Sequence, residues 1–479
     1  MSKPGPQLTI LALFSFAIYL FAFVRPYSLF EWWTQPGQTI AKISNYDPVA
    51  GAAFVLANLA LFSLYWLATR LVLKFRDARG WTIVILGALA FNLVMLALYP
   101  VEADDIFTYA LRGRMQALHG ANPFYQRPSS AEVFRNDPFY EYVGWRDFPT
   151  AYGPWWEWLA AGVARLPGDG VIANVLAFKT VMVFAYAATA ALIALSLRGR
   201  APARVLYGVT LFAWNPLVIY AAAGNGHNDS VMLFFLVLGF YFLARGNFTL
   251  AALAETAGAL VKLMPALVFP VVIVAALQHI TGWQARLRYL AVTGLACAAL
   301  VLLSYAPFWR GPEILTDDWR AYLFTTSLPA MIQAAAQEQL DPKLAVTLVS
   351  RGALLVLALG IGWQLLALSR RRAAFQGYVS AALSILLFYL LVAGQWFQPW
   401  YTVWAIALAA LLPDGVLSRG SILLTFTATF RMPGVDFLMG SRPDQLPTPL
   451  AREWLSTTAT LALPWLYFVS HYRATANRS

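Results

Sequence analysis

The chain has 479 residues, of which 60% are hydrophobic and 12% are charged, about half the charged fraction of a typical soluble domain. This composition excludes a soluble globular protein and indicates a polytopic membrane protein. The net charge of +11 comes from short clusters of cations between apolar runs, as in loops that face the inner leaflet, so no nucleic acid partner is expected. The single cysteine, Cys297, lies inside an apolar run and excludes an intramolecular disulfide.

Apolar runs follow one another along almost the whole chain, and a helix needs about 20 apolar residues to cross a bilayer. The runs fall at 8–24, 49–73, 81–99, 171–196, 205–222, 229–244, 248–261, 264–278, 287–307, 345–368, 374–393, 400–413, 420–432 and 451–471. Some are too short to cross alone, so we expect an all-α polytopic membrane protein with about 12 to 14 transmembrane or re-entrant helices. Arg25 and Pro26 follow the first run instead of a small-residue cleavage site, which predicts an uncleaved span.

Residues 1–479 are therefore expected to form one transmembrane domain with two external excursions. The first, at 100–170, is rich in aromatic residues and proline, which favours short helices lying in the membrane interface. It is the predicted catalytic loop, and 308–344 is the second external loop.

Most cations of the short loops fall on one side of the membrane if the runs alternate. They are Lys3, Arg70, Lys74, Arg76, Arg79, Arg198, Arg200, Arg204, Arg245, Arg286, Arg288, Arg370, Arg371, Arg372, Arg419, Arg473 and Arg478. Their bias predicts a multi-pass protein of the cytoplasmic (inner) membrane with both termini in the cytoplasm. The alternation requires 248–278 to be a hairpin of two short helices broken near Lys262 and Pro265, because proline disfavours helix in the residue before it.

The acidic stretch after the third run is the centre of the predicted site, which faces outward in this topology. Asp105 is the candidate general base, because a carboxylate within reach of an acceptor hydroxyl can take its proton. Asp104 is the alternative base, and a pair of solvated loop carboxylates explains both equally well from position alone. If the segment is helical, Asp105 and Tyr109 share one face.

Cations inside the apolar runs suggest an anionic ligand such as a lipid phosphate. Lys262, at the turn of the predicted hairpin, is costly there unless it faces water or an anion. The other candidate phosphate ligands are Lys179, Arg351, Arg431 and Arg114. Solvated or snorkelling side chains are the alternative for these four.

Polar and aromatic groups on the same side are candidates for binding the sugar or the acceptor. They are Tyr109, Tyr152, His227, Asn228, Asp229, Gln395, Gln398, Trp400 and Tyr401. Asp229 could instead cap the helix that follows it, and the aromatic residues could form an interfacial belt. His227, Asp229 and the acidic pair of the first loop could hold a divalent metal, but their spacing does not demand one, so no cofactor is predicted.

Several short motifs occur in a characteristic order. They are Asp105-Ile-Phe-Thr-Tyr109-Ala, Gly113-Arg114, Gly120-Ala-Asn-Pro-Phe124, Tyr152-Gly-Pro154, His227-Asn-Asp229, Lys262-Leu-Met-Pro265 and Gln398-Pro-Trp-Tyr401. Together they resemble the polyprenyl-phosphate-sugar-dependent glycosyltransferases of the GT-C class, and most closely the bacterial alpha-mannopyranosyltransferases that use polyprenyl-phosphate mannose. The acidic loop follows the third predicted span here, whereas in many members of that class it follows the first.

The resemblance implies a GT-C-like helix bundle and inverting transfer of a hexose to an acceptor hydroxyl on the outer face. Mannose is the usual sugar of the family. It implies a polyprenyl-phosphate sugar as donor, a glycan or glycolipid of the cell envelope as acceptor, membrane lipid as a partner, and Asp105 as the base. A transporter or flippase of lipid-linked sugars is the alternative. Transporters usually show paired broken helices related by internal symmetry, whereas this sequence has one hairpin and a large acidic loop on one side.

Overall fold

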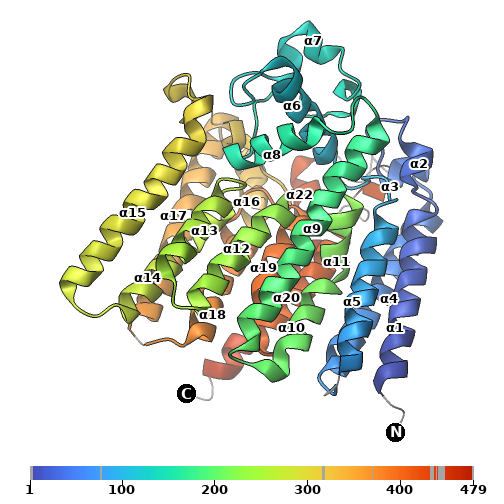
Figure 1. Cartoon of the computed structure of the whole chain (residues 1–479). Helices are drawn as coiled ribbons and strands as arrows, with labels where there is room; N and C mark the ends of the chain where they lie inside the picture. Colours follow the sequence, from blue (N-terminus) through green and yellow to red (C-terminus); the bar gives the residue numbers. More distant parts are fainter. Residues whose placement is uncertain are drawn as a thin grey trace.

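The computed structural model in Figure 1 is a bundle of helices with a cap of short helices at one end. It describes residues 4–75, 78–315, 319–370, 372–431, 436–437, 440 and 448–476. The start of α1 and the end of α22 (Pro449–Ala476) lie at the end of the bundle opposite the cap.

Seven helical segments of the described chain are long and apolar enough to cross a membrane. They are Pro4–Val24 (α1, Pro4–Ile18, and its π-helical end), Pro48–Val72 (α4), Ala78–Met95 (α5), Val171–Arg198 (α9), Trp283–Phe308 (α15, Trp283–Tyr305, and a 3-10 turn), Pro342–Ser369 (α17) and Phe375–Ala393 (α18, Phe375–Phe388, and its π-helical end). One further pair of helical segments, Pro202–Ala213 and Pro216–Gly224, is bent by 55° and forms a broken span or a re-entrant loop. The prediction of an all-α polytopic membrane protein is confirmed.

Shorter helices complete the bundle. They are α10 (Val205–Ala213), α11 (Pro216–Ile219), α12 (Asp229–Ala244), α13 (Phe248–Ala259), α14 (Phe269–His279), α16 (Leu328–Ala336), α19 (Val403–Ala409) and α20 (Val416–Ala428). Every residue of α19 is buried, which places this helix in the core, where a helix can be apolar on all sides.

Residues 248–278 fold as the predicted hairpin of two short helices. The ring of Phe248 at the start of α13 lies 5.4 Å from the ring of His279 at the end of α14, centroid to centroid, so the two helices run antiparallel. The turn between them contains Lys262 and a short 3-10 helix at Met264–Leu267. Lys262 is therefore carried toward the cap, at the end of the hairpin remote from Phe248.

The cap consists of α6 (Asp105–His119), α7 (Glu132–Arg135) and α8 (Pro154–Ala164), with α2 (Leu29–Trp32) and α3 (Ile40–Ile43) beside them (Figure 1). Helix α6 ends at Gly120, whose φ of +63° is the left-handed conformation that glycine adopts easily at helix ends. It packs closely on α8, because Gly113 approaches the backbone carbonyl of Ala160.

The cap and the hairpin are joined by backbone hydrogen bonds. The N–H of Gly153 donates to the carbonyl of Val261 and that of Trp155 donates to Leu260, each at 3.1 Å. A Cβ added at Gly153 would lie 2.0 Å from the carbonyl oxygen of Leu260, so only glycine permits this contact. The contact fixes Lys262 next to Tyr152.

Candidate functional site

A cavity of about 700 Å³ lies between the cap and the bundle, a size typical of small-molecule sites. Its polar and aromatic lining comprises Glu102, Asp104, Asp105, Arg112, Trp145, Tyr152, Lys262, Trp319, Gln395, Trp396, Gln398, Trp400, Tyr401, Arg431 and Asp436. The structure thus brings together both candidate bases, two of the candidate phosphate ligands and five of the candidate sugar or acceptor ligands, from segments far apart in the sequence.

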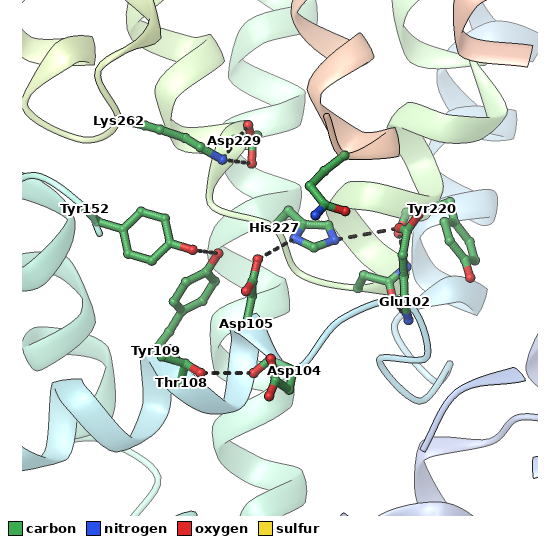
Figure 2. A network of polar contacts seen from close by, with 12 residues as sticks. Glu102, Asp104, Asp105, Thr108, Tyr109, Tyr152, Tyr220, His227, Asp229 and Lys262 are labelled. Carbon is green, nitrogen blue, oxygen red and sulfur yellow. Dashed lines mark hydrogen bonds and ion pairs between the residues drawn. The ribbon is translucent and has the colours of Figure 1, made fainter. Parts of the chain in front are cut away.

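Asp105 is the first residue of α6 and faces both the cavity and the interior. Its side chain is 17% exposed, and its Oδ2 lies 3.4 Å from Nδ1 of His227. Figure 2 shows Asp105 between His227 and the Tyr109–Tyr152 pair, whose hydroxyls are 3.3 Å apart. The helix therefore puts Asp105 and Tyr109 on one face, as the spacing of four predicted.

Asp104 is held differently from its neighbour. One carboxylate oxygen accepts a hydrogen bond from the N–H of Gly144 in the cap. Burial, and after it the charge of Asp105, raise the pKa of Asp104 to about 6, while the bond from Gly144 lowers it. Asp104 is thus tied to the cap loop, which leaves Asp105 as the better placed base.

Lys262 forms a buried ion pair at the wall of the cavity. Its Nζ lies 2.8 and 3.0 Å from the two carboxylate oxygens of Asp229 (Figure 2). Nε1 of Trp404 donates to the same carboxylate at 2.6 Å, and Nζ of Lys262 lies 4.6 Å from the ring centroid of Tyr401. The suggestion that Asp229 caps α12 is wrong, because the N-cap residue is Asn228 and no side-chain capping bond is present there.

Four of the candidate sugar ligands lie behind the cavity wall instead of lining it. Tyr109, His227, Asn228 and Asp229 are at most 2% exposed and are absent from the cavity lining. Their predicted contact with sugar or acceptor does not fit this placement, because the His227-Asn-Asp229 turn enters the bundle and the ring of Tyr109 packs on Trp156.

His227 is packed between two carboxylates and an indole ring. Its ring stacks on Trp400 with centroids 3.9 Å apart and an angle of 14°, and its Nε2 lies 3.7 Å from Oε2 of Glu102. Burial by itself lowers the pKa of His227, but the neighbouring Asp105 and Glu102 outweigh it and raise the pKa above its ordinary value.

Three of the predicted phosphate ligands lie elsewhere. Lys179 is fully buried in α9 and donates to the backbone carbonyls of Leu96 and Leu98. Arg351 is exposed on α17 and is not part of the cavity lining. Neither residue is placed to meet a ligand in this cavity.

Arg114 is the third of these, and its guanidinium supports the cap. It contacts Asp137 at 2.8 Å and Asp169 at 2.6 Å and donates to the carbonyl of Gly168. Arg112, two residues earlier in the same helix, lines the cavity instead. For Arg114 the alternative of a solvated side chain is wrong, because the residue is 4% exposed.

Arg431 lines the cavity as expected and is oriented by three neighbours. Its guanidinium donates to the hydroxyls of Thr325 and Thr326 at 2.8 and 2.7 Å and to Oε1 of Gln398 at 3.0 Å. Thr326 has a φ of +49°, a conformation that is rare for a β-branched residue. No sequence pattern predicted these two threonines as partners, since they lie more than a hundred residues before Arg431.

Within the described ranges, no group of three or more His, Cys, Asp or Glu side chains is arranged to hold a metal ion. Asp229, one of the residues considered for a metal, is paired with Lys262. The expectation of no demanded cofactor, with a divalent metal possible, stays a prediction.

These features define a polytopic α-helical membrane protein with a cavity of carboxylates, cations and aromatic rings beneath an interfacial cap. Residues 12–278, more than half of the chain, match the family described as "Alpha-(1->6)-mannopyranosyltransferase, N-terminal domain". The chain belongs to this family, which confirms the resemblance drawn from the motifs.

Curated relatives carry the same description. Alpha-(1->6)-mannopyranosyltransferase A of Corynebacterium glutamicum is 25% identical over 195 residues, which are 39% of this chain and 37% of the relative. An alpha-(1->6)-mannopyranosyltransferase of Mycobacterium tuberculosis is 25% identical over 181 residues, 32% of this chain and 26% of the relative. The matches thus span well under half of either relative. No solved structure matches the chain.

Proposed function

We propose that this protein is an inverting glycosyltransferase that transfers mannose from a polyprenyl-phosphate donor to an acceptor hydroxyl. The observation that carries the proposal is the cavity itself, in which Asp105 shares one space with Lys262, Arg112 and Arg431. A base and a group of cations in one enclosure are what such a transfer requires. The family description and the names of the curated relatives support mannose as the sugar.

In this proposal Asp105 takes the proton of the acceptor hydroxyl. The hydroxyl oxygen attacks the anomeric carbon of the sugar, and the lipid phosphate leaves from the opposite face with the electron pair of the broken bond. Inversion follows because attack and departure occur on opposite faces of the sugar.

The cations of the cavity stabilise the phosphate as its charge grows. Arg431 is oriented for this by Thr325 and Gln398, and an arginine can bind two phosphate oxygens at once. Lys262 is balanced by Asp229 in the structure, so it supplies a fixed cation without leaving an unpaired charge in an empty site.

The cavity walls supply contacts for the sugar and the acceptor. Gln395, Gln398, Trp400 and Tyr401 line it together with Tyr152. Amide and phenol groups can hydrogen-bond hydroxyls. We place the cavity at the outer face of the cytoplasmic membrane and expect a glycan or glycolipid acceptor.

The proposal is tested with purified protein in detergent, polyprenyl-phosphate mannose and a panel of glycan and glycolipid acceptors, with EDTA in a parallel reaction. Mannosylated product is expected, with inverted configuration at the anomeric carbon. Protein that forms no product but moves the lipid-linked sugar across liposomes would instead be a transporter. Loss of product in EDTA would show that the reaction requires a divalent metal, and unchanged turnover would show that it does not.

A further inference from the structure

We propose that Glu102 and His227 are positioning residues for Asp105, whose carboxylate they hold aimed into the cavity. The inference rests on the proposed function, because it assigns a role relative to the base of that reaction. It also replaces the expectation that His227 binds sugar.

The three side chains form a continuous line, in which the buried His227 lies between Glu102 and Asp105, both of which line the cavity. Nδ1 of His227 lies 3.4 Å from Oδ2 of Asp105, and Nε2 lies 3.7 Å from Oε2 of Glu102 (Figure 2). In the described part of the chain, neither ring nitrogen of His227 and no group near Oε2 of Glu102 completes a hydrogen bond. A buried histidine with both nitrogens directed at carboxylates is satisfied only as an imidazolium that donates to both.

The fold fixes His227 in this place. Gly226 has a φ of +70°, and a Cβ added there would lie 2.4 Å from the side chain of Ile106 in α6, so the turn passes directly against the helix that begins with Asp105. The backbone N–H of Glu102 donates to Oδ1 of Asn225 at 3.0 Å. The turn that carries His227 therefore contacts both Glu102 and the helix that begins with Asp105.

The face of the imidazole is covered by Trp400. An indole face attracts a cation that lies over it, which favours the imidazolium and keeps it from rotating. Trp400 itself lines the cavity, so sugar bound there would contact the indole and not the imidazole.

Other charged groups surround this line at greater remove. Asp104 is the chain neighbour of Asp105 and interacts with its charge. Arg431 and Asp436 interact electrostatically with Glu102. The stem of Lys179 packs against Gly226. Only Asp105 and Glu102 contact the ring nitrogens of His227 among the described residues, so these two set its protonation directly.

The arrangement separates two tasks. The imidazolium orients one oxygen of Asp105 and leaves the other for the acceptor proton, and Glu102 keeps the imidazole protonated. Removing His227 takes a positive charge away from the site, so the acidic limb of the pH profile should lie at higher pH. Removing Glu102 makes His227 lose its proton at lower pH.

The test compares kcat/KM against pH for wild type, His227→Gln, Glu102→Gln and the double variant. His119→Gln, at the exposed end of α6, is the matched control. We expect His227→Gln to lower kcat by about 10- to 100-fold, the usual cost of losing a partner that orients a functional side chain, and to move the acidic limb to higher pH. Glu102→Gln should move the basic limb to lower pH, and it should add nothing further in the His227→Gln background.

If both limbs of the pH profile of kcat/KM stay at their wild-type positions in His227→Gln and in Glu102→Gln, while Asp105→Asn is inactive, the inference is overturned and the proposed function stands. A fully active Asp105→Asn would overturn both. If His227→Gln does not fold, Glu102→Gln alone decides, because an amide of the same shape replaces its carboxylate. If the basic limb of the pH profile of Glu102→Gln then lies where it does in wild type, the inference is contradicted.

Discussion

Two adjacent carboxylates at the start of α6 lie in different surroundings. Asp104 accepts the N–H of Gly144 and has a pKa raised to about 6, whereas Asp105 meets His227 and the cavity. Two neighbouring acids whose environments differ commonly have different roles in a site. We assign Asp104 to holding the cap loop and Asp105 to the chemistry.

Replacing Asp104 tests this assignment through stability. Above about pH 6 the buried carboxylate is charged beside Asp105, which costs the folded state free energy, and protonation relieves that cost as the pH falls toward 3.8, the ordinary value. Asp104→Asn keeps an acceptor for Gly144 without the charge. We expect its apparent Tm to exceed that of wild type by a few degrees near pH 8, with the gap closing as the pH falls toward 4.

The measurement is thermal unfolding in detergent across this pH range. Asp147→Asn, at an exposed position of the cap, should match wild type throughout. A gap for Asp104→Asn that widens at acid pH would show that the carboxylate stabilises the cap in its charged form.

At the scale of elements, the site depends on two close backbone contacts. The turn at Gly226 touches α6, and the turn of the α13–α14 hairpin touches the start of α8 through Gly153. One contact sets His227 beside Asp105, and the other sets Lys262 beside Tyr152. A side chain at Gly153 would meet the backbone carbonyl of Leu260 and force the elements apart, whereas one at Gly226 would meet the end of the Ile106 side chain, which would have to move.

Gly226→Ala should therefore lower activity more than it lowers stability. The new Cβ meets Ile106, and displacing a catalytic group by about 1 Å can cost on the order of 100-fold in rate. Gly246→Ala is the control, because Gly246 has a φ of +75° and nothing within 4 Å of the added atom. Both variants carry the strain of a positive φ, and only Gly226→Ala should lose kcat per folded molecule. Equal kcat values would contradict the proposed role of the turn.

The elements themselves were largely predictable from sequence. Apolar runs marked the spans, and Pro265 marked the break that produces the hairpin, because both signals act within a few residues of the chain. The acidic start of α6 and the cavity position of Lys262 followed from the same local pattern.

Partners across the fold were not predictable. Lys179 looked like Lys262 in sequence, but its ammonium is satisfied by the carbonyls that end α5, and Asp229 looked like a helix cap but pairs with Lys262. Such outcomes depend on which groups tertiary packing brings within about 3 Å, and the sequence alone carries no such distances.

At the scale of the whole molecule, the cap lies at one end of the bundle, and the start of α1 and the end of α22 lie at the other (Figure 1). The cavity is lined by residues of the cap and so lies at the first end. The cation bias of the short loops predicts that the second end faces the cytoplasm. The cavity then opens on the outer side, where lipid-linked donors are expected.

Single-cysteine labelling in intact cells tests this orientation. In a Cys297→Ser background, Asp147→Cys in the cap should react with a membrane-impermeant maleimide. Gly199→Cys, which is exposed after α9 at the opposite end, should react only after the membrane is permeabilised. The reverse pattern would place the cavity in the cytoplasm.

The central claim is that Asp105 is the base of a mannosyl transfer, and turnover of Asp105→Asn with polyprenyl-phosphate mannose tests it most directly. We predict a loss of at least about 100-fold in kcat, with donor binding retained because the cations of the cavity are unchanged, and full activity for the control Asp147→Asn. An Asp105→Asn protein that turns over as fast as wild type would contradict the account.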